Sequence, residues 1–268
     1  MTSGQPDSET LPSALDDFDQ LRPRMTGRCV AVFLDYDGTL APIVERPEDA
    51  ILAGTMRAAV ATLARYAPVT IVSGRGLDEV RGLVDIATLW YAGSHGFEIS
   101  GPDGRRLDYE GGEAFAAAIA EAERALRERL QIAGAWVESK KLAIAVHYRQ
   151  AAEEDVAAIE ALVDAVAAEQ PRLRKSGGKK VFELRPRVDW HKGTAVLRLL
   201  DVLGLSEARA LPIYIGDDVT DEDAFQSIAG RGVGIVVRGA VAESAAEFSL
   251  RNPDEVEEFL RRLASELE

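Results

Sequence analysis

The sequence has almost no cysteine and no long apolar run. Its single cysteine, Cys29, excludes an internal disulfide framework and argues against a cysteine-based zinc site. No apolar stretch reaches the roughly 20 residues that a membrane-spanning helix needs. Residues 1–24 lack the apolar segment flanked by positive charge that marks a secretory signal. These absences predict a cytoplasmic protein that does not interact with a membrane.

Basic residues are also in deficit. The chain has 31 Lys and Arg against 45 Asp and Glu, and its formal net charge is −14. Without a basic stripe to neutralise a phosphate backbone, nucleic acid is excluded as a partner. An anionic substrate must therefore be attracted by a local cluster of Lys and Arg. The length of 268 residues and the 47% apolar content fit one large α/β domain, or a core domain with a smaller inserted one.

Short apolar runs alternate with amphipathic segments along most of the chain. The runs predict strands over Val30–Leu34, Pro68–Val72, Thr88–Ala92, Pro212–Ile215 and Val233–Val237. The amphipathic segments predict helices over Thr55–Tyr66 (with Thr55 as N-cap), Leu77–Val84, Lys192–Leu203, Asp221–Ile228 and Asp254–Leu263. This alternation predicts the α/β class, with right-handed βαβ units and a Rossmann-like parallel sheet.

The alternation is interrupted in the middle of the chain. A hairpin is predicted within Ile99–Leu107, helices over Glu113–Leu130 and Glu153–Ala168, and strands over Trp136–Tyr148 and Val181–Arg185. We therefore expect a catalytic core formed by residues 28–105 and 187–268, with an inserted α+β module over 106–186. Residues 1–27 are polar and are expected to be a disordered tail or a short surface helix.

Polar residues follow three of the predicted core strands. Asp35 and Asp37 follow the first strand, Ser73 the second, and Asp217 and Asp218 a later one. Ligands of open parallel sheets bind outside the carboxyl ends of the strands, so these side chains are expected to face one crevice. Lys192, at the start of a predicted helix, lies near the point where the chain re-enters the core.

These residue types suit phosphoryl transfer. Asp35 and Asp217 offer the hard oxygen ligands that Mg²⁺ prefers. An ionised Asp35 could attack phosphorus in line, and Asp37, two residues on, could protonate the leaving oxygen and later deprotonate water. Ser73 and Lys192 would bind the remaining phosphoryl oxygens.

Each residue also has a purely structural interpretation. The Asp-x-Asp-Gly motif begins a calcium-binding loop in EF-hands, but such a loop needs Gly and Glu where this chain has Leu40 and Arg46. Asp35 and Asp37 could form a turn, Ser73 could do the same, and Lys192 could be solvated at a helix start. Asp221 could equally serve the metal site or the first turn of its helix. The occurrence of all these residues in one order favours the catalytic interpretation.

The motifs resemble those of the haloacid dehalogenase superfamily of phosphatases. The matching residues are Asp35–Thr39, Ser73–Arg75, Lys192 and Gly216–Asp218. The chain looks, more narrowly, like the trehalose-6-phosphate phosphatases. That resemblance rests on Leu34–Ile43, Tyr91–Gly96, Val137–Lys140, His147–Arg149, Phe182–Pro186 and Gly216–Asp223. It covers the chain from about Arg28 onward.

The resemblance implies roles for individual residues. Asp35 would be the nucleophile and Asp37 the acid and base, and Mg²⁺ would be bound by Asp35, the backbone carbonyl of Asp37, and Asp217, with Asp221 as a further residue of the metal site. Tyr36 and Arg75, within the motifs, would contact the substrate together with Asp35 and Asp37. The inserted module would be a cap whose Glu138, Lys140, Arg149 and Glu183 hydrogen-bond the two glucose units.

Strand alternation bears on the cap residues. It places Ala143, Ala145, His147 and Arg149 on one face, which we expect to be open and suited to a ligand. The other face, with Leu142, Ile144, Val146 and Tyr148, is expected to be packed. His95 is a weak candidate for sugar contact. His191 stands where the family has Asn or Ser before Lys-Gly, and its role is open.

The expected reaction is the magnesium-dependent hydrolysis of trehalose 6-phosphate, the second step of trehalose synthesis. A trehalose-phosphate synthase would then be a natural partner. The rivals are a phosphatase for another sugar phosphate (sucrose phosphate, glucosylglycerol phosphate or mannosylglycerate phosphate), a phosphomannomutase-like transferase, and a non-catalytic binding protein.

Overall fold

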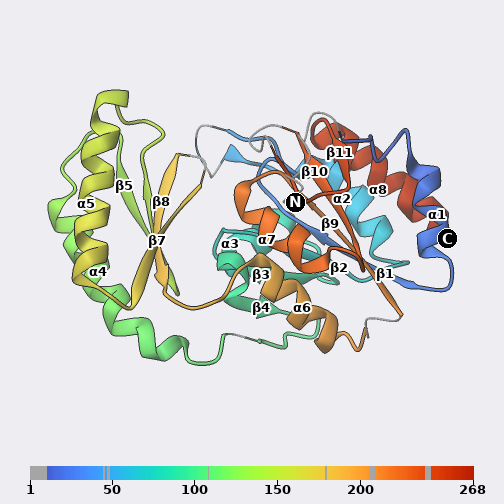
Figure 1. Ribbon diagram of the computed structural model, residues 1–268, viewed down its shortest axis with the longest axis horizontal. Helices are drawn as coiled ribbons and strands as arrows, with labels where there is room; N and C mark the ends of the chain where they lie inside the picture. Colours follow the sequence, from blue (N-terminus) through green and yellow to red (C-terminus); the bar gives the residue numbers. More distant parts are fainter. Residues whose placement is uncertain are drawn as a thin grey trace, which may run out of the picture. The chain divides into compact units, whose positions relative to one another are not determined.

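The structure, a computed structural model, describes residues 11–44, 46, 49–107, 109–178, 180–205, 209–238 and 243–268. The chain divides into two compact units (Figure 1). One comprises the residues up to Leu107 together with Trp190–Glu268, and the other is the insertion Asp108–Asp189. The module expected over 106–186 differs from this insertion by only two or three residues at each end.

The first unit is built on a seven-stranded sheet in the order β11-β10-β9-β1-β2-β3-β4. Its strands are β1 (Cys29–Leu34), β2 (Val69–Val72), β3 (Trp90–Gly93), β4 (Glu98–Ser100), β9 (Ala210–Gly216), β10 (Val233–Val237) and β11 (Phe248–Leu250). All neighbouring strands are parallel except β3 and β4. The predicted Rossmann-like core is confirmed. The strand β11 was missed because three residues are too few to show a period.

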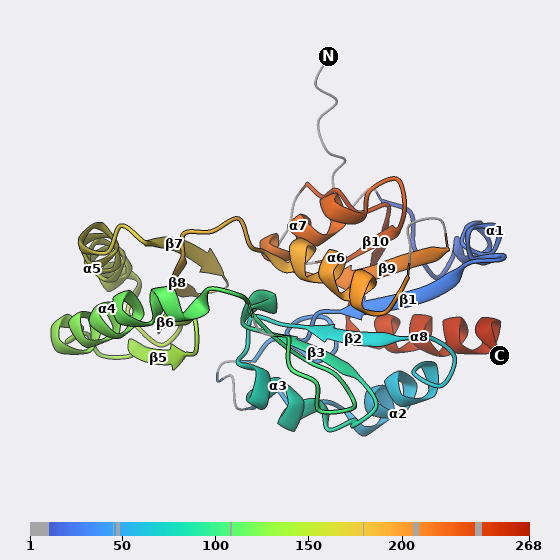
Figure 2. The same cartoon turned by 90° about the horizontal axis from the view of Figure 1, so that it is seen from below.

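Helices cover both faces of this sheet (Figure 2). On one face lie α2 (Gly54–Leu63), α3 (Leu77–Val84) and α8 (Pro253–Leu267), and on the other α6 (Lys192–Val202) and α7 (Val219–Ile228). Alternate residues of β1 serve the two cores, because successive side chains of a strand point to opposite faces. Among the described residues, no helix is both long and apolar enough to cross a bilayer.

The start of α2 differs from the prediction. The helix begins at Gly54, its N-cap is Ala53, and no side chain caps it. Thr55 therefore lies inside the first turn, and its prediction as N-cap is wrong. At α8, by contrast, the Asn252 side chain accepts a hydrogen bond from the backbone nitrogen of Glu255 at 3.0 Å.

The described part of the N-terminal segment is ordered and contains a short helix, so of the two expectations for residues 1–27 the disordered tail is wrong for this part. Residues 11–27 contain a 3-10 turn, η2 (Phe18–Gln20), and the short helix α1 (Arg22–Met25). The backbone nitrogen of Ala14 donates to the carbonyl of Ser249 at 3.0 Å, so the segment covers the edge of β11. Phe18 is fully buried and packs edge-on against Phe259 at 5.7 Å. Residues 1–10 lie outside the described part. The polar composition concealed five buried residues spaced along the segment: Leu11, Ala14, Phe18, Leu21 and Met25.

The second unit is an α+β module. Its antiparallel sheet has the order β5-β6-β8-β7, formed by β5 (Trp136–Lys140), β6 (Ala143–His147), β7 (Leu173–Gly178) and β8 (Val181–Pro186). The predicted strand 136–148 is thus two strands, and β7 was missed because its Arg, Lys, Ser and Gly residues show no apolar alternation. The helices α4 (Ala116–Arg129) and α5 (Val156–Glu169), preceded by the 3-10 turns η5 (Gly112–Phe115) and η6 (Glu153–Asp155), cover one face (Figure 1).

We expect Phe18→Ala to destabilise the protein markedly, since it removes a ring that is completely buried against α8. The free energy of unfolding, measured in urea, should fall by about 3–5 kcal/mol. Ile51→Ala is the control, because Ile51 is 70% exposed. That substitution should change the free energy by less than about 0.5 kcal/mol. Equal effects of the two substitutions would mean that residues 11–27 are not part of the folded core.

Candidate active site

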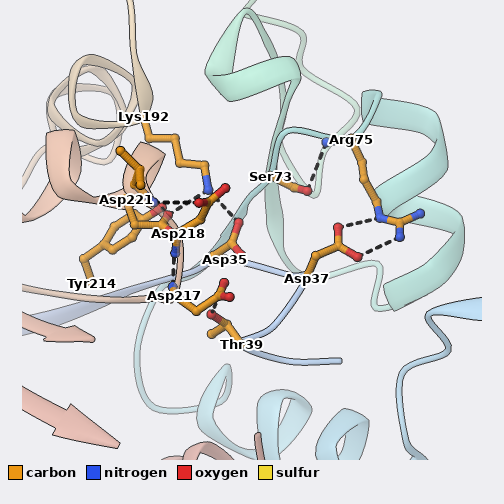
Figure 3. Close-up of polar contacts among 11 residues, drawn as sticks. Asp35, Asp37, Thr39, Ser73, Arg75, Lys192, Tyr214, Asp217, Asp218 and Asp221 are labelled. Atoms are coloured by element: carbon orange, nitrogen blue, oxygen red, sulfur yellow. Dashed lines mark hydrogen bonds and ion pairs between the residues drawn. The ribbon is translucent and has the colours of Figure 1, made fainter. Parts of the chain in front are cut away.

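The polar residues predicted at the strand ends lie together at one edge of the core sheet (Figure 3). Leu34, the last residue of β1, is in register with Ile71 of β2 and Ile215 of β9. Because these neighbouring strands are parallel, the residues that follow them emerge at the same edge. Asp35 follows β1 directly, and Ser73 and Asp217 follow β2 and β9.

Three buried carboxylates form the centre of the site. Asp35, Asp217 and Asp221 each place a carboxylate oxygen within 4.8 Å of the others, and their exposed fractions are 4%, 2% and 0%. The ammonium of Lys192, equally buried at the start of α6, lies 2.6 Å from Oδ1 of Asp35 and 2.7 Å from Oδ1 of Asp221. Lys192 is therefore not the solvated lysine of the structural interpretation.

The charges of this cluster do not balance. Burial raises the pKa of Asp35 well above its usual range, and the neighbouring Asp221 and Asp217 raise it further against the opposing effect of Lys192. Burial would lower the pKa of Lys192, but the carboxylates of Asp221 and Asp35 outweigh it and raise that pKa. One cation thus faces three acidic groups, all of them oxygen donors. The donor set fits a hard divalent cation, which would restore the balance and favour ionised Asp35.

Asp221 has its oxygens occupied by the protein. Oδ1 accepts from Lys192 and, at 2.6 Å, from the hydroxyl of Tyr214. Oδ2 accepts from the backbone nitrogens of Asp217 at 3.1 Å and Asp218 at 3.0 Å, which closes a capping box at the start of α7. Asp221 therefore has the predicted place in the first turn of its helix, and its role at a metal site stays a prediction. Tyr214 is a neighbour of the carboxylate cluster that no sequence motif indicated.

Asp37 is held apart from the cluster. Its two carboxylate oxygens accept from Nε and Nη2 of Arg75, each at 2.7 Å, and Arg75 also pairs with Glu79. Figure 3 shows the Asp37 carboxylate turned toward Arg75 and away from Lys192. Its role at the metal site through the backbone carbonyl stays a prediction. Ser73, 1% exposed, accepts a hydrogen bond from the backbone nitrogen of Arg75 at 3.1 Å.

The predicted contact of Tyr36 with substrate can involve only its backbone. Its side chain lies in the hydrophobic core, and its hydroxyl donates to the carbonyl of Ala50 at 2.6 Å. Burial raises its pKa to about 12. Only the backbone of Tyr36 remains available at the sheet edge, because the side chain after Asp35 points to the opposite face of the extended chain.

Two glycines leave the space that the carboxylates of Asp217 and Asp221 occupy. Gly38 has φ +90°, and a Cβ there would overlap the carboxylate of Asp217. A Cβ at Gly216 would likewise overlap the side chain of Asp221. Both glycines stood in the motifs, but only the fold reveals which carboxylate each one accommodates.

The structure also answers the question of His191. Its Nδ1 accepts from the backbone nitrogen of Thr194 at 3.3 Å, so His191 is the N-cap of α6 and takes the place of the expected Asn or Ser. His95 is buried in a left-handed conformation, φ +57°, with its ring close to Gly74.

The candidate cap residues lie in the second unit. Ser139 of β5 bonds Glu123 of α4 at 2.8 Å, so Glu138 and Lys140 point to the face without helices. Lys140 pairs with Glu183 of β8 at 2.7 Å. The strand alternation had predicted Arg149 on one face of the strand. In the structure, Arg149 lies in the turn after β6 and is exposed.

The alanines of β6 were expected to lie on an open face, but the structure buries them. Ala143 and Ala145 are 2% and 0% exposed. They lie between β5 and β8, and their small size lets Lys140 and Glu183 meet across them.

Comparison with known proteins identifies the family of this chain. The family model described as Trehalose-phosphatase matches residues 33–254. The chain belongs to the trehalose-phosphatase family. It is 43% identical over 273 residues to Trehalose 6-phosphate phosphatase RA3 of Zea mays, an alignment that covers 96% of this chain and 76% of that protein. It is 42% identical over 264 residues to Probable trehalose-phosphate phosphatase D of Arabidopsis thaliana, with coverages of 94% and 72%.

A solved structure shares the fold of this trehalose-phosphatase. The Aspergillus fumigatus trehalose-6-phosphate phosphatase (crystal form 3) is 27% identical with a TM-score of 0.66, and the match covers 95% of this chain and 99% of that one. The predicted family, the haloacid dehalogenase-like fold and the class of phosphoric monoester hydrolase are thereby confirmed.

Gly38→Ala should abolish catalysis by this trehalose-phosphatase while leaving it folded. The added Cβ would displace Asp217 from the carboxylate cluster, so binding of a divalent cation should weaken as well. Gly27→Ala is the matched control, because Gly27 also has a positive φ, +73°, but nothing lies within 4 Å of the place that its new methyl group would take. Phosphatase rate and cation affinity by calorimetry would test this. Wild-type values for Gly38→Ala would refute the steric argument.

Proposed function

We propose that this chain hydrolyses trehalose 6-phosphate to trehalose and phosphate in a magnesium-dependent reaction that forms an aspartyl-phosphate, as a step of trehalose synthesis. The observation that carries the proposal is the convergence of Asp35, Asp217 and Asp221 with Lys192 at the carboxyl edge of the core sheet. Membership of the trehalose-phosphatase family supports the choice of sugar.

Asp35 is the nucleophile in this proposal. Its carboxylate attacks phosphorus, the bond from phosphorus to the sugar oxygen breaks, and an acyl phosphate forms. Asp37 gives its proton to the departing sugar oxygen. Asp37 then takes a proton from water, which attacks the acyl phosphate, releases phosphate and regenerates Asp35.

The neighbouring residues prepare this reaction. Asp35, Asp217 and the backbone carbonyl of Asp37 would hold Mg²⁺, which would supply positive charge to the phosphoryl oxygens. Lys192 and the hydroxyl of Ser73 bind the same group of oxygens, where negative charge is spread in the transition state. Asp221 orients Lys192 and the backbone after β9, which makes it an organising residue more than a direct ligand.

Arg75 links substrate binding to the acid. Nε and Nη2 of Arg75 each bond one carboxylate oxygen of Asp37, so the pair holds this side chain in a fixed position. If Arg75 turns to the substrate, the Asp37 carboxylate loses this partner and becomes available to the leaving oxygen. The exchange of partners would free Asp37 only when substrate is bound.

Four residues of the second unit bind the sugar in this proposal: Glu138, Lys140, Arg149 and Glu183. Three of them lie on the helix-free face of the second unit, where the Lys140–Glu183 ion pair and the hydrogen bond between His147 and Glu138 hold these groups in fixed positions. Such groups suit the many hydroxyls of a disaccharide. A cytoplasmic location and an association with a trehalose-phosphate synthase remain predictions from the sequence.

The function is tested by phosphate release from trehalose 6-phosphate with Mg²⁺. We expect turnover that stops with a chelator and returns when Mg²⁺ is added. Asp35→Asn should lower the rate at least about a thousandfold, because an amide keeps the shape of the carboxylate but is not a nucleophile. Asp78→Asn, at a carboxylate that is 88% exposed, should leave the rate unchanged.

The same assay separates the rival activities. Equal turnover of sucrose phosphate, mannosylglycerate phosphate and trehalose 6-phosphate would show that the enzyme is not specific for trehalose 6-phosphate. Phosphate transfer that needs a bisphosphate activator and releases little free phosphate would indicate a mutase.

Arg149→Ala should impair the use of trehalose 6-phosphate far more than that of a small aryl phosphate. The loss of a charge-assisted hydrogen bond should lower kcat/KM for the sugar phosphate by about 10- to 100-fold. Arg124→Ala, an exposed arginine of α4 in the same unit, is the control and should affect neither substrate. An equal loss for both substrates would show that Arg149 does not read the sugar.

A further inference from the structure

Two aromatic residues flank one of the candidate sugar contacts. The rings of Trp136 and His147 stack with a centroid distance of 4.0 Å and an interplanar angle of 13°. Nε2 of the same histidine lies 2.7 Å from Oε2 of Glu138. Trp136 is 43% exposed, one of few large apolar side chains exposed in the described part of the chain.

Strand register explains this arrangement. Trp136 of β5 is directly opposite His147 of β6, and Glu138 follows two residues later on the same face. The stack restricts the plane of the imidazole, and the direction of Nε2 with it. A hydrogen bond from this nitrogen then fixes the diagonal neighbour, Glu138.

We propose that His147 is a positioning residue that holds the Glu138 carboxylate in place for a sugar hydroxyl, and that Trp136 fixes His147 by stacking. The proposal deepens the function proposed above and rests on it. It assigns a specificity role to two residues that have no part in the phosphoryl chemistry.

The carboxylate of Glu138 gains two properties from this contact. With Oε2 bonded to His147, the group presents Oε1 as an acceptor without a further loss of side-chain freedom on binding. Burial would raise the pKa of Glu138, but the hydrogen bond of His147 and the charge of Lys140 outweigh it and lower that pKa. Glu138 therefore remains an acceptor in neutral solution.

Two substitutions separate the hydrogen bond from the ring. His147→Phe keeps a ring for Trp136 and removes the donor, whereas His147→Gln supplies an amide nitrogen in place of Nε2. We expect His147→Phe to raise KM for trehalose 6-phosphate about tenfold, with kcat changed less than about twofold. His147→Gln should recover much of the loss, and kinetics with an aryl phosphate should be unchanged in both.

A double-mutant cycle with Glu138→Gln decides whether His147 acts through Glu138. If it does, the double variant Glu138→Gln/His147→Phe should be no worse than Glu138→Gln alone. Glu123→Gln is the matched control, since Glu123 bonds Ser139 of the same strand from the opposite face. It should leave KM for trehalose 6-phosphate unchanged.

Three results would overturn the inference. Additive losses in the double variant would show that His147 acts independently, and the sugar-reading role of Glu138 would survive. A parallel loss of aryl-phosphatase activity in His147→Phe would indicate a general structural defect. A Glu138→Gln variant with normal KM would overturn both the inference and the assignment of Glu138 to the sugar, whereas phosphate release by the wild type would still stand.

Discussion

The buried cluster of carboxylates around Lys192 constrains the rest of the core. Three acidic groups with one ammonium are costly to bury, so the fold must supply compensating donors, and the oxygen donors that remain fit a divalent cation. Asp221 shows how the protein meets this need, because a lysine, a tyrosine and two backbone nitrogens satisfy its oxygens. Gly38 and Gly216 are part of the same constraint, since any side chain there would occupy the space of a carboxylate.

The two units place their polar residues on different kinds of sheet. In the parallel sheet, the clustered carboxylates follow the strand ends, and the strands themselves are buried on both faces. In the antiparallel sheet, helices cover one face and charged residues occupy the other. The small alanines of β6 leave room for Lys140 of β5 and Glu183 of β8 to form an ion pair across that strand.

Predictions from sequence succeeded where a segment carries its own signal. The apolar runs of β1, β2, β9 and β10 are continuous because both of their faces are buried, and each was found close to its observed bounds. The segments β7 and β11 carry no such signal, since one is polar and the other has three residues. The N-terminal segment was misjudged because its few apolar residues find partners only in α8 and the core.

At the site, local patterning was enough to identify the acidic motifs, the lysine and the order in which they occur, because phosphoryl chemistry requires these residue types at strand ends. Long-range packing alone decided which groups pair. The burial of Tyr36, the clamp of Arg75 on Asp37, the contact of Tyr214 with Asp221 and the stack of Trp136 on His147 all join residues from separate segments or strands. Such contacts depend on strand register and side-chain direction. The sequence around each residue does not determine these two properties.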